Sequence, residues 1–108
     1  MRHEPIYLGE LEQMILLAVL QCADDAYGVT VQGELARRTT RRVASGAIYM
    51  TLDRLEKKGL LASRLTEPVA ERGGRAKRCY TLTKPAMIAL KHSRQALLNL
   101  WQGLELAD

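Results

Sequence analysis

Residues 45–60, SGAIYMTLDRLEKKGL, decide the fold. Ile48, Leu52 and Leu55 recur at the spacing of one helix face, and Gly59 suits the left-handed conformation that ends many helices. Beyond this glycine the apolar pattern changes from helical to alternating, which is typical of strands. A helix followed directly by a hairpin predicts a winged helix-turn-helix, mainly α with a small β-hairpin.

Two strands are predicted after this helix. The runs LASRL at 61–65 and RCYTL at 78–82 alternate in polarity, and a polar, glycine-containing segment, 67–76, joins them. In the second run Tyr80 and Leu82 fall on one face, because side chains alternate between the two faces of a strand. Such a hairpin is the predicted wing of the fold.

Two more helices are predicted before residue 45. The first covers about 10–22 and is apolar on nearly every side. Its Leu16, Leu17 and Leu20 therefore need a cover that a thin domain does not provide. The second covers about 27–38, and a short arginine-rich connection follows it.

Hydroxyl side chains stand at the start of two predicted helices. Ser45 is expected to cap the third helix and Thr83 a fourth. The fourth helix runs to about Leu104 and repeats its apolar residues at alternating spacings of three and four, the pattern of a coiled-coil seam. The seam consists of Met87, Leu90, Arg94, Leu97, Trp101 and Leu104, and Arg94 is its one polar member.

These unpartnered surfaces predict a homodimer. A chain of 108 residues buries one modest core. A seam on an isolated helix needs a second helix to cover it. The predicted dimerisation residues are Leu16, Leu17, Leu20, Met87, Leu90, Leu97, Trp101 and Leu104.

Positive charge is concentrated in the middle of the chain. Residues 37–78 hold twelve Lys and Arg against four Asp and Glu, a net charge of +8, whereas the rest of the chain carries −4. Polyanions attract such a patch through counterion release. Double-stranded DNA is therefore the predicted partner. The alternative is a solvated, salt-bridged surface.

In a helix-turn-helix the third helix here would enter the major groove by its N-terminal end. Gly46 permits close approach of the backbone, and Tyr49 and Met50 offer apolar contact to thymine methyl groups. The predicted base-reading residues are Ser45, Gly46, Tyr49, Met50 and Arg54. The residues predicted to contact the DNA backbone are Arg37, Arg38, Arg41, Arg42 and Lys57.

The predicted wing carries its charges beside two glycines. Its candidate DNA-contacting residues are Arg72, Gly73, Gly74, Arg75 and Lys77. Arg72 and Arg75 suit a narrow minor groove, which attracts arginine. The alternative is that the glycines only turn the chain and that the charges serve solubility.

Catalytic, metal and membrane functions are not indicated. The phosphate-loop, zinc-protease and nucleophile-elbow motifs are missing, and the adjacent Asp24 and Asp25 suit loop or capping roles. Cys22 and Cys79 form no C-x-x-C pair, so neither zinc nor a disulfide is predicted. From the missing motifs we expect a protein that is not an enzyme and has no cofactor. Because no apolar run of about 18 residues and no signal segment is present, we also expect it to be cytoplasmic and to have no membrane span.

A set of short motifs extends over nearly the whole chain. The motifs are Gly9-Glu10-Leu11-Glu12 with the apolar run from Ile15, Tyr27-Gly28, Ser45-Gly46-Ala47-Ile48-Tyr49, Leu52, Arg54-Leu55-Glu56, Gly59-Leu60-Leu61, Gly73-Gly74-Arg75, Lys77-Arg78, Tyr80 and Leu82-Thr83. Together they resemble the PadR-like winged-helix transcriptional regulators, named for the phenolic acid decarboxylase repressor. Two residues depart from the pattern: Met50 replaces a usual proline and Ala86 a frequent glycine.

The resemblance implies a homodimer built by the C-terminal helix and repression through an inverted-repeat operator. For some members it also implies release by a small planar molecule, for which Trp101, Leu97 and Met14 are the candidate residues. Trp101 is alternatively a plain seam side chain. We expect a DNA-binding domain at 1–82 and a dimerisation helix at 83–108, in one compact unit. The alternative function is a winged-helix protein-protein interaction module.

Overall fold

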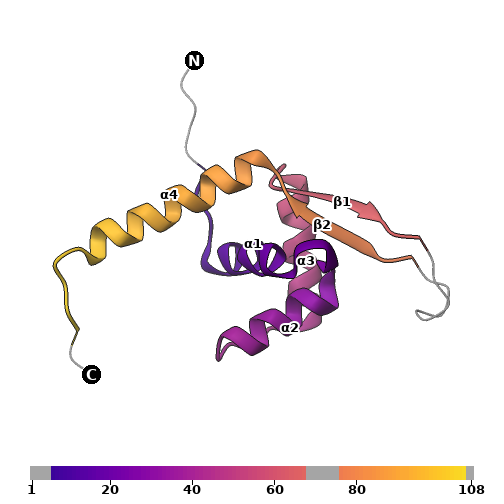
Figure 1. Ribbon diagram of the computed structural model, residues 1–108, viewed down its shortest axis with the longest axis horizontal. Coiled ribbons are helices and arrows are strands. Elements are labelled where there is room, and N and C mark those ends of the chain that lie inside the picture. The colour runs from indigo at the N-terminus through magenta and orange to yellow at the C-terminus, as the bar shows by residue number, and fades with distance from the viewer. Residues whose placement is uncertain (1–5, 68–75, 107–108) are drawn as a thin grey trace, which may run out of the picture.

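The computed structural model describes residues 6–67 and 76–106. Its elements in chain order are α1 (Glu10–Cys22), a 3-10 turn η1 (Ala23–Asp25), α2 (Gly28–Arg38), α3 (Ser45–Lys57), β1 (Leu61–Leu65), β2 (Arg78–Leu82) and α4 (Lys84–Trp101). Figure 1 shows α1, α2 and α3 packed together, with the hairpin extending from one side and α4 from the other. The expected fold, mainly helical with a two-stranded hairpin, is confirmed.

The hairpin is tied to the helical body through its second strand. β1 and β2 pair antiparallel, with Leu61 opposite Leu82. The backbone N–H of Tyr80 donates to the carbonyl oxygen of Ala26 at 2.8 Å, so β2 is held beside the segment just before α2. Four of the predicted wing residues lie outside the described residues, namely Arg72, Gly73, Gly74 and Arg75. The structure therefore places the base of the wing.

The three helices of the body share one apolar core. Ile15 of α1 and Val31 of α2 are fully buried. The predicted inward face of α3 is confirmed, because Ile48, Leu52 and Leu55 have no exposed surface. This face fixes which side of α3 is left for a partner.

The expectation that Leu16 needs an external cover was wrong. Leu16 is 0% exposed and belongs to the core, because α1 is enclosed by α2, α3 and β2. Leu17 and Leu20 remain 50% and 43% exposed. They are the two leucines of α1 whose side chains are largely exposed.

Neither predicted hydroxyl cap forms. Ser45 is the first residue of α3, and its Oγ donates to Oε1 of Gln32 at 3.3 Å. Thr83 does precede α4, but its Oγ1 donates to the carbonyl oxygen of Gly59 at 2.7 Å. Each hydroxyl thus joins its helix to a different part of the chain.

The predicted role of Gly59 at the end of α3 is confirmed. Gly59 has a φ of +77°, and its N–H donates to the carbonyl oxygen of Glu56 at 2.9 Å. The N–H of Leu60 donates to the carbonyl oxygen of Leu55, also at 2.9 Å, which completes a Schellman motif. The turn places the buried Leu60 in the core, and β1 begins at the next residue.

Helix α4 joins the body only through its first turns. Ala86, Ala89 and Leu90 are buried, whereas no residue from Lys91 to Leu106 is. The helix has 18 residues and so spans about 27 Å, ending three residues before the predicted Leu104. Its second half runs clear of the body (Figure 1). The division of the chain between residues 82 and 83 stays a prediction.

An ion pair that the sequence did not indicate joins α1 to the end of α3. Glu12 is 7% exposed, and its Oε2 accepts from Nζ of Lys58 at 2.7 Å. Its Oε1 accepts from the N–H of Gly9 at 3.0 Å. Burial alone would raise the pKa of Glu12, but the hydrogen bonds from Lys58 and Gly9 outweigh burial and hold that pKa below its ordinary value.

We expect Glu12 to make the free energy of unfolding fall in acid. Because its pKa is lowered in the folded state, its contribution is complete above the ordinary glutamate pKa of about 4.3 and is lost as the pH falls through the lower folded-state pKa. Glu12→Gln should therefore flatten the acid limb of stability measured by urea unfolding. The control is Glu10→Gln, whose side chain is 82% exposed. An unchanged acid limb in Glu12→Gln would contradict this assignment.

Candidate nucleic-acid interface

The outward face of α3 brings together four predicted base-reading residues. Met50 is 67% exposed and Tyr49 is 50% exposed. Ser45 and Gly46 are also exposed at the N-terminal end of the helix. The backbone N–H groups of a first helical turn lack partners within the helix and favour an anion. This end of α3 is thus open to a polyanion.

Gln32 fixes the start of α3 against α2. Its Nε2 donates to the carbonyl oxygen of Val43 at 2.9 Å, and its Oε1 accepts from Oγ of Ser45. These two hydrogen bonds join α2 to the end of the connecting segment and to the first residue of α3. They therefore set the direction in which the N-terminal end of α3 points.

The ring of Tyr49 lies against Gly28, the first residue of α2. A Cβ on Gly28 would come within 2.4 Å of Cε1 and Cζ of Tyr49 and within 2.5 Å of its hydroxyl oxygen. Gly28 is accordingly buried, while Tyr49 keeps half of its surface exposed. The hydroxyl end of the ring is directed toward α2.

Lys77 is the predicted wing residue that the structure places. Its Nζ lies 4.4 Å from the centre of the Tyr27 ring, a cation–π contact. The carbonyl oxygen of Lys77 accepts from the N–H of Thr66 at 2.7 Å, which continues the hairpin beyond its strands. The hydroxyl of Tyr27 donates to Asp25. The base of the wing is thereby joined to the start of α2.

Two of the predicted backbone-contacting arginines are bound to a carboxylate of their own helix. Arg37 and Arg38 both donate to Glu34, Arg38 at 2.6 Å, and these hydrogen bonds hold the pKa of Glu34 below its ordinary value. Arg38 lines a groove beside Met14 and Leu17 of α1. The charges of both arginines are therefore partly compensated by Glu34.

The other predicted backbone contacts differ in how their charges are paired. Nη1 of Arg41 donates to Oε1 of Glu10 in α1 at 2.7 Å, and Nζ of Lys57 lies 3.0 Å from Oδ2 of Asp53. Arg42 is exposed and forms no ion pair with any residue of the described ranges. Its charge is the most available of the five.

Arg54, the fifth predicted base-reading residue, is exposed one helical turn beyond Met50 on α3. Residues four apart share one side of a helix, so Arg54 lies on the side of α3 that carries Met50, and its charge also helps to lower the pKa of Glu12. It also follows Gly46 by eight residues, about 12 Å along the helix. Tyr49, by contrast, faces the start of α2.

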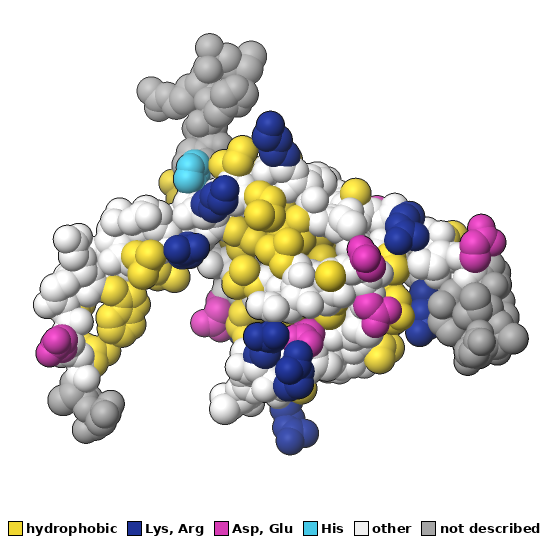
Figure 2. All heavy atoms as spheres, viewed as in Figure 1, with side chains coloured by type: hydrophobic (Ala, Val, Ile, Leu, Met, Phe, Trp, Pro, Cys, Tyr) yellow, Lys and Arg dark blue, Asp and Glu magenta, His cyan; other side chains and the backbone are white. Residues whose placement is uncertain are grey.

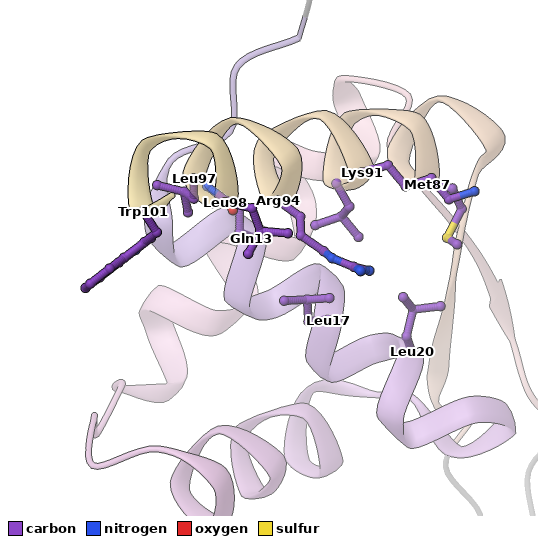
Figure 3. A pocket seen from close by; sticks show the side chains of 10 residues that line it. Gln13, Leu17, Leu20, Met87, Lys91, Arg94, Leu97, Leu98 and Trp101 are labelled. Atoms are coloured by element: carbon purple, nitrogen blue, oxygen red, sulfur yellow. The ribbon is translucent and has the colours of Figure 1, made fainter. Parts of the chain in front are cut away.

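A groove of about 510 Å³ runs between α1 and α4 (Figure 3). Its lining consists of Gln13, Leu17, Leu20, Met87, Leu90, Lys91, Arg94, Leu97, Leu98 and Trp101. Figure 3 shows Arg94 reaching from α4 into this space, with Trp101 at its open end. In Figure 2 apolar side chains cover the middle of the same face and the inner side of α4. The structure thus brings the seam of α4 and the exposed leucines of α1 together.

Two residues predicted for this region lie elsewhere. Met14 lines a separate groove between α1 and α2, where its Sδ is 3.7 Å from Nη1 of Arg41. Leu104 follows the end of α4 and lines a small hollow at the C-terminal end of that helix, with Leu97 and Trp101. Grouping Met14 with Trp101 and Leu97 was therefore wrong, because α1 turns Met14 toward α2.

Comparison with known proteins identifies the family. The family model described as "Transcriptional regulator PadR-like family" matches residues 16–91, from α1 into α4. The chain belongs to this family. The resemblance carried by the sequence motifs is thereby confirmed.

Similar proteins agree with the PadR-like assignment. Transcriptional regulator Rv3488 of Mycobacterium tuberculosis is 39% identical over 77 residues, which cover 71% of this chain and 67% of that protein. A PadR family regulator from Eggerthella lenta is 25% identical with a TM-score of 0.68, over 87% of this chain and 81% of that one. A PadR-like regulator from Bacillus cereus is 26% identical with a TM-score of 0.65, over 87% of this chain and 93% of that one.

Other features of this PadR-like regulator concern metals, thiols and membranes. Among residues 6–67 and 76–106, no three His, Cys, Asp or Glu side chains gather in a way that suits a metal ion. Cys22 and Cys79 are both free thiols. Within the same described ranges, no helix has the length and apolar character needed to cross a membrane.

The PadR-like regulator also uses residues that sequence reasoning missed. Lys91 and Leu98 line the groove and directly follow seam positions, so a wider seam would have included them. Nothing in the sequence indicated the roles of Gln13 and Gln32, because a single polar residue on a helix does not reveal which neighbour it contacts. Their contacts depend on how the helices pack.

Proposed function

We propose that this protein is a homodimeric repressor that binds an inverted-repeat operator in double-stranded DNA. The observation that carries the proposal is the exposed N-terminal end of α3, where Ser45, Gly46 and Met50 stand on a helix held from behind by the core. Recognition helices enter the major groove by this end. Repression rather than activation follows from the resemblance to the family's naming member, and a cytoplasmic location follows from that role.

Gly46 supports a close approach of DNA to this end of α3. A Cβ at Gly46 would meet no heavy atom within 4 Å, so the fold itself does not need glycine there. Glycine within a helix is about 1 kcal/mol less favourable than alanine. Glycine at this position would be explained by a bound molecule, such as DNA, that approaches the backbone so closely that a side chain would be in its way.

The cations around α3 are proposed to contact phosphate groups. Arg42 is free to do so, whereas Arg37, Arg38, Arg41 and Lys57 would exchange an exposed ion pair for a phosphate. Such surface pairs are worth only about 0–1 kcal/mol, so the exchange is energetically accessible. The wing residues outside the described ranges stay predictions in the same role.

A second copy of the chain is the proposed cover for the groove between α1 and α4. Leu17 and Leu20 face this groove together with the seam residues of α4. The second half of α4 is exposed on all sides and carries Leu97, Leu98 and Trp101 into the solvent in a single chain. Pairing two copies would bury these side chains and set two α3 helices at a fixed spacing.

We further propose that space left beside Trp101 and Leu97 in the dimer takes a small planar effector. Trp101 is the only tryptophan of the chain, so its fluorescence reports this site alone. Titration with planar aromatic compounds, phenolic acids included, should quench the emission in a saturable way and release operator DNA. The control is Trp101→Leu, which should keep operator binding while losing the release. Unsaturable quenching by every compound would leave Trp101 as a packing residue only.

Salt dependence tests the main proposal. Operator fragments selected from a random duplex pool should bind with a logarithmic affinity that falls linearly against the logarithm of salt concentration, by about 0.9 per neutralised phosphate. The selected half-sites should lie about one helical turn apart. Absent or salt-indifferent binding would instead favour a winged-helix module that contacts proteins.

Arg42→Ala should weaken binding to every duplex and reduce the salt slope by about 0.9, because one phosphate contact is lost. The control is Lys84→Ala, which removes one positive charge at the exposed start of α4, outside the predicted DNA-contacting residues. Equal salt slopes for Arg42→Ala and Lys84→Ala would show that Arg42 does not contact the backbone.

A further inference from the structure

We propose that Tyr49 acts in DNA binding as a positioning residue, and that its partner in this role is Gly28. The ring of Tyr49 holds α3 against the start of α2, and only a hydrogen atom fits beneath it at Gly28. This inference rests on the proposed DNA-binding function. It assigns the contacts with base edges to Ser45, Gly46 and Met50.

The contact between Tyr49 and Gly28 admits no side chain. A Cβ on Gly28 would lie 2.4 Å from two ring atoms of Tyr49, a separation that real Cβ contacts essentially never show. Gly33, the other glycine of α2, has no heavy atom within 4 Å of the same position. The two glycines of one helix therefore differ: a methyl group at Gly33 would meet no neighbour, whereas at Gly28 it would have to displace the half-exposed Tyr49 ring.

The start of α2 is also where the wing is attached. Tyr27 precedes Gly28 and carries the ammonium group of Lys77 over its ring. Its N–H donates to Oγ1 of Thr30 at 3.0 Å, which fixes the first turn of the helix. Ala26 holds β2 through the hydrogen bond from Tyr80. The wing and α3 thus both contact the same short segment, residues 26–28 at the start of α2.

The ring contact therefore sets the position of α3 relative to the wing. Two DNA-contacting elements bind one duplex well only if their spacing and angle match its grooves. Loosening the contact should reduce binding to the operator more than binding to unrelated DNA, because nonspecific contacts with phosphate groups tolerate small shifts. The packing contact with Gly28 is made by the edge of the Tyr49 ring, which Tyr49→Phe retains apart from the hydroxyl oxygen.

The test compares matched alanine substitutions in the full-length protein. Affinities for a selected operator duplex and for an unrelated duplex of equal length are measured, together with thermal unfolding. Gly28→Ala should lower operator affinity by about tenfold or more and affinity for the unrelated duplex by less than about threefold, because the added methyl group displaces the Tyr49 ring that holds α3. Gly33→Ala should leave both affinities unchanged. Equal operator affinities for Gly28→Ala and Gly33→Ala would overturn the proposal.

Substitutions of Tyr49 separate positioning from base contact. Tyr49→Phe keeps the ring and should bind the operator like the natural protein, whereas Tyr49→Ala should lose about as much as Gly28→Ala. Because the clash needs both side chains, Gly28→Ala combined with Tyr49→Ala should lose no more than Tyr49→Ala alone. A loss in Tyr49→Phe as large as in Tyr49→Ala would show that the hydroxyl contacts DNA and would overturn the proposal.

Two further outcomes have definite meanings. Should Gly28→Ala fail to fold, the double substitution must fold if the Tyr49 ring is the obstacle, and its failure to fold overturns the proposal. If the natural protein binds neither duplex, the DNA-binding function itself is contradicted and this inference falls with it. The variant comparisons, made with a natural protein that does bind, bear on Tyr49 and Gly28 alone.

Discussion

Leu17→Asp should convert the protein into a folded monomer and lower its affinity for a two-site operator by about 10²–10⁴-fold. Leu17 is half exposed in the single chain and lines the groove between α1 and α4. A carboxylate there is solvated in the monomer but would have to be desolvated without a partner in the dimer. Losing the dimer removes the linkage between two recognition helices, and with it the gain from simultaneous binding to both half-sites.

Sedimentation and DNA binding on the same samples measure this effect. The matched control is Leu65→Asp, because Leu65 is 63% exposed on β1 and lies away from the groove. That variant should stay dimeric. Each Leu17→Asp subunit should still bind a single half-site weakly, with unchanged circular dichroism. A Leu17→Asp protein that remains dimeric at micromolar concentration would show that the subunits pair through another surface.

Leu16→Ala should lower the free energy of unfolding by about 2–5 kcal/mol, the range for removing a large side chain from a packed core. Leu16 has no exposed surface and belongs to the cluster formed with α2 and α3. The side chains around it come from several elements, so the cavity collapses only in part. The loss should appear at every protein concentration, because it belongs to the single chain.

The neighbouring leucine provides the comparison. Leu17→Ala should change the unfolding of the monomer by less than about 1 kcal/mol, since half of that side chain is already in solvent. Its main effect should be a weaker dimer, seen as a concentration-dependent shift in urea unfolding. If Leu16→Ala behaved like Leu17→Ala, Leu16 would lie at the subunit interface after all.

The parts of this protein that sequence alone predicted are those governed by local rules. The first helix was predicted at about 10–22, and the structure has it at Glu10–Cys22. The spacing of Ile48, Leu52 and Leu55 placed the core side of α3 correctly, and Gly59 ended that helix as expected. Helix period, strand alternation and the left-handed preference of glycine act over a few residues, so they are visible in a short stretch of sequence.

The hydroxyl caps show where local rules stopped. Ser45 and Thr83 stood in suitable positions to cap helices, yet each donates to a more distant partner, Gln32 and Gly59. A capping hydroxyl must turn its oxygen toward the N–H groups of the first helical turn in order to accept from them, and here each hydroxyl is turned instead toward an acceptor that packing brings close. The sequence indicates that such a group is present but not which acceptor reaches it.

The same distinction applies to the candidate site. Counting charges predicted the basic middle of the chain, but only the structure distinguishes Arg41, which is bound to Glu10, from Arg42, which has no ion pair within residues 6–67 and 76–106. Periodicity marked Leu16 and Leu17 alike as apolar residues outside the main stripe, and the packing of α1 against three neighbours buried only the first of them completely. Likewise, nothing in the sequence brings Tyr49 over Gly28, which lies 21 residues earlier.

Local patterns in the sequence were enough to predict the helices, the hairpin, the inward face of α3 and the family. The packed structure was needed to show which apolar side chains of α1 and α4 are exposed, which arginines are paired with carboxylates, and that the Tyr49 ring lies over Gly28. The physical reason is that a side chain's face on its own helix follows from the helix period, whereas its neighbours follow from the packing of whole elements. The function proposed for the exposed end of α3 depends on both.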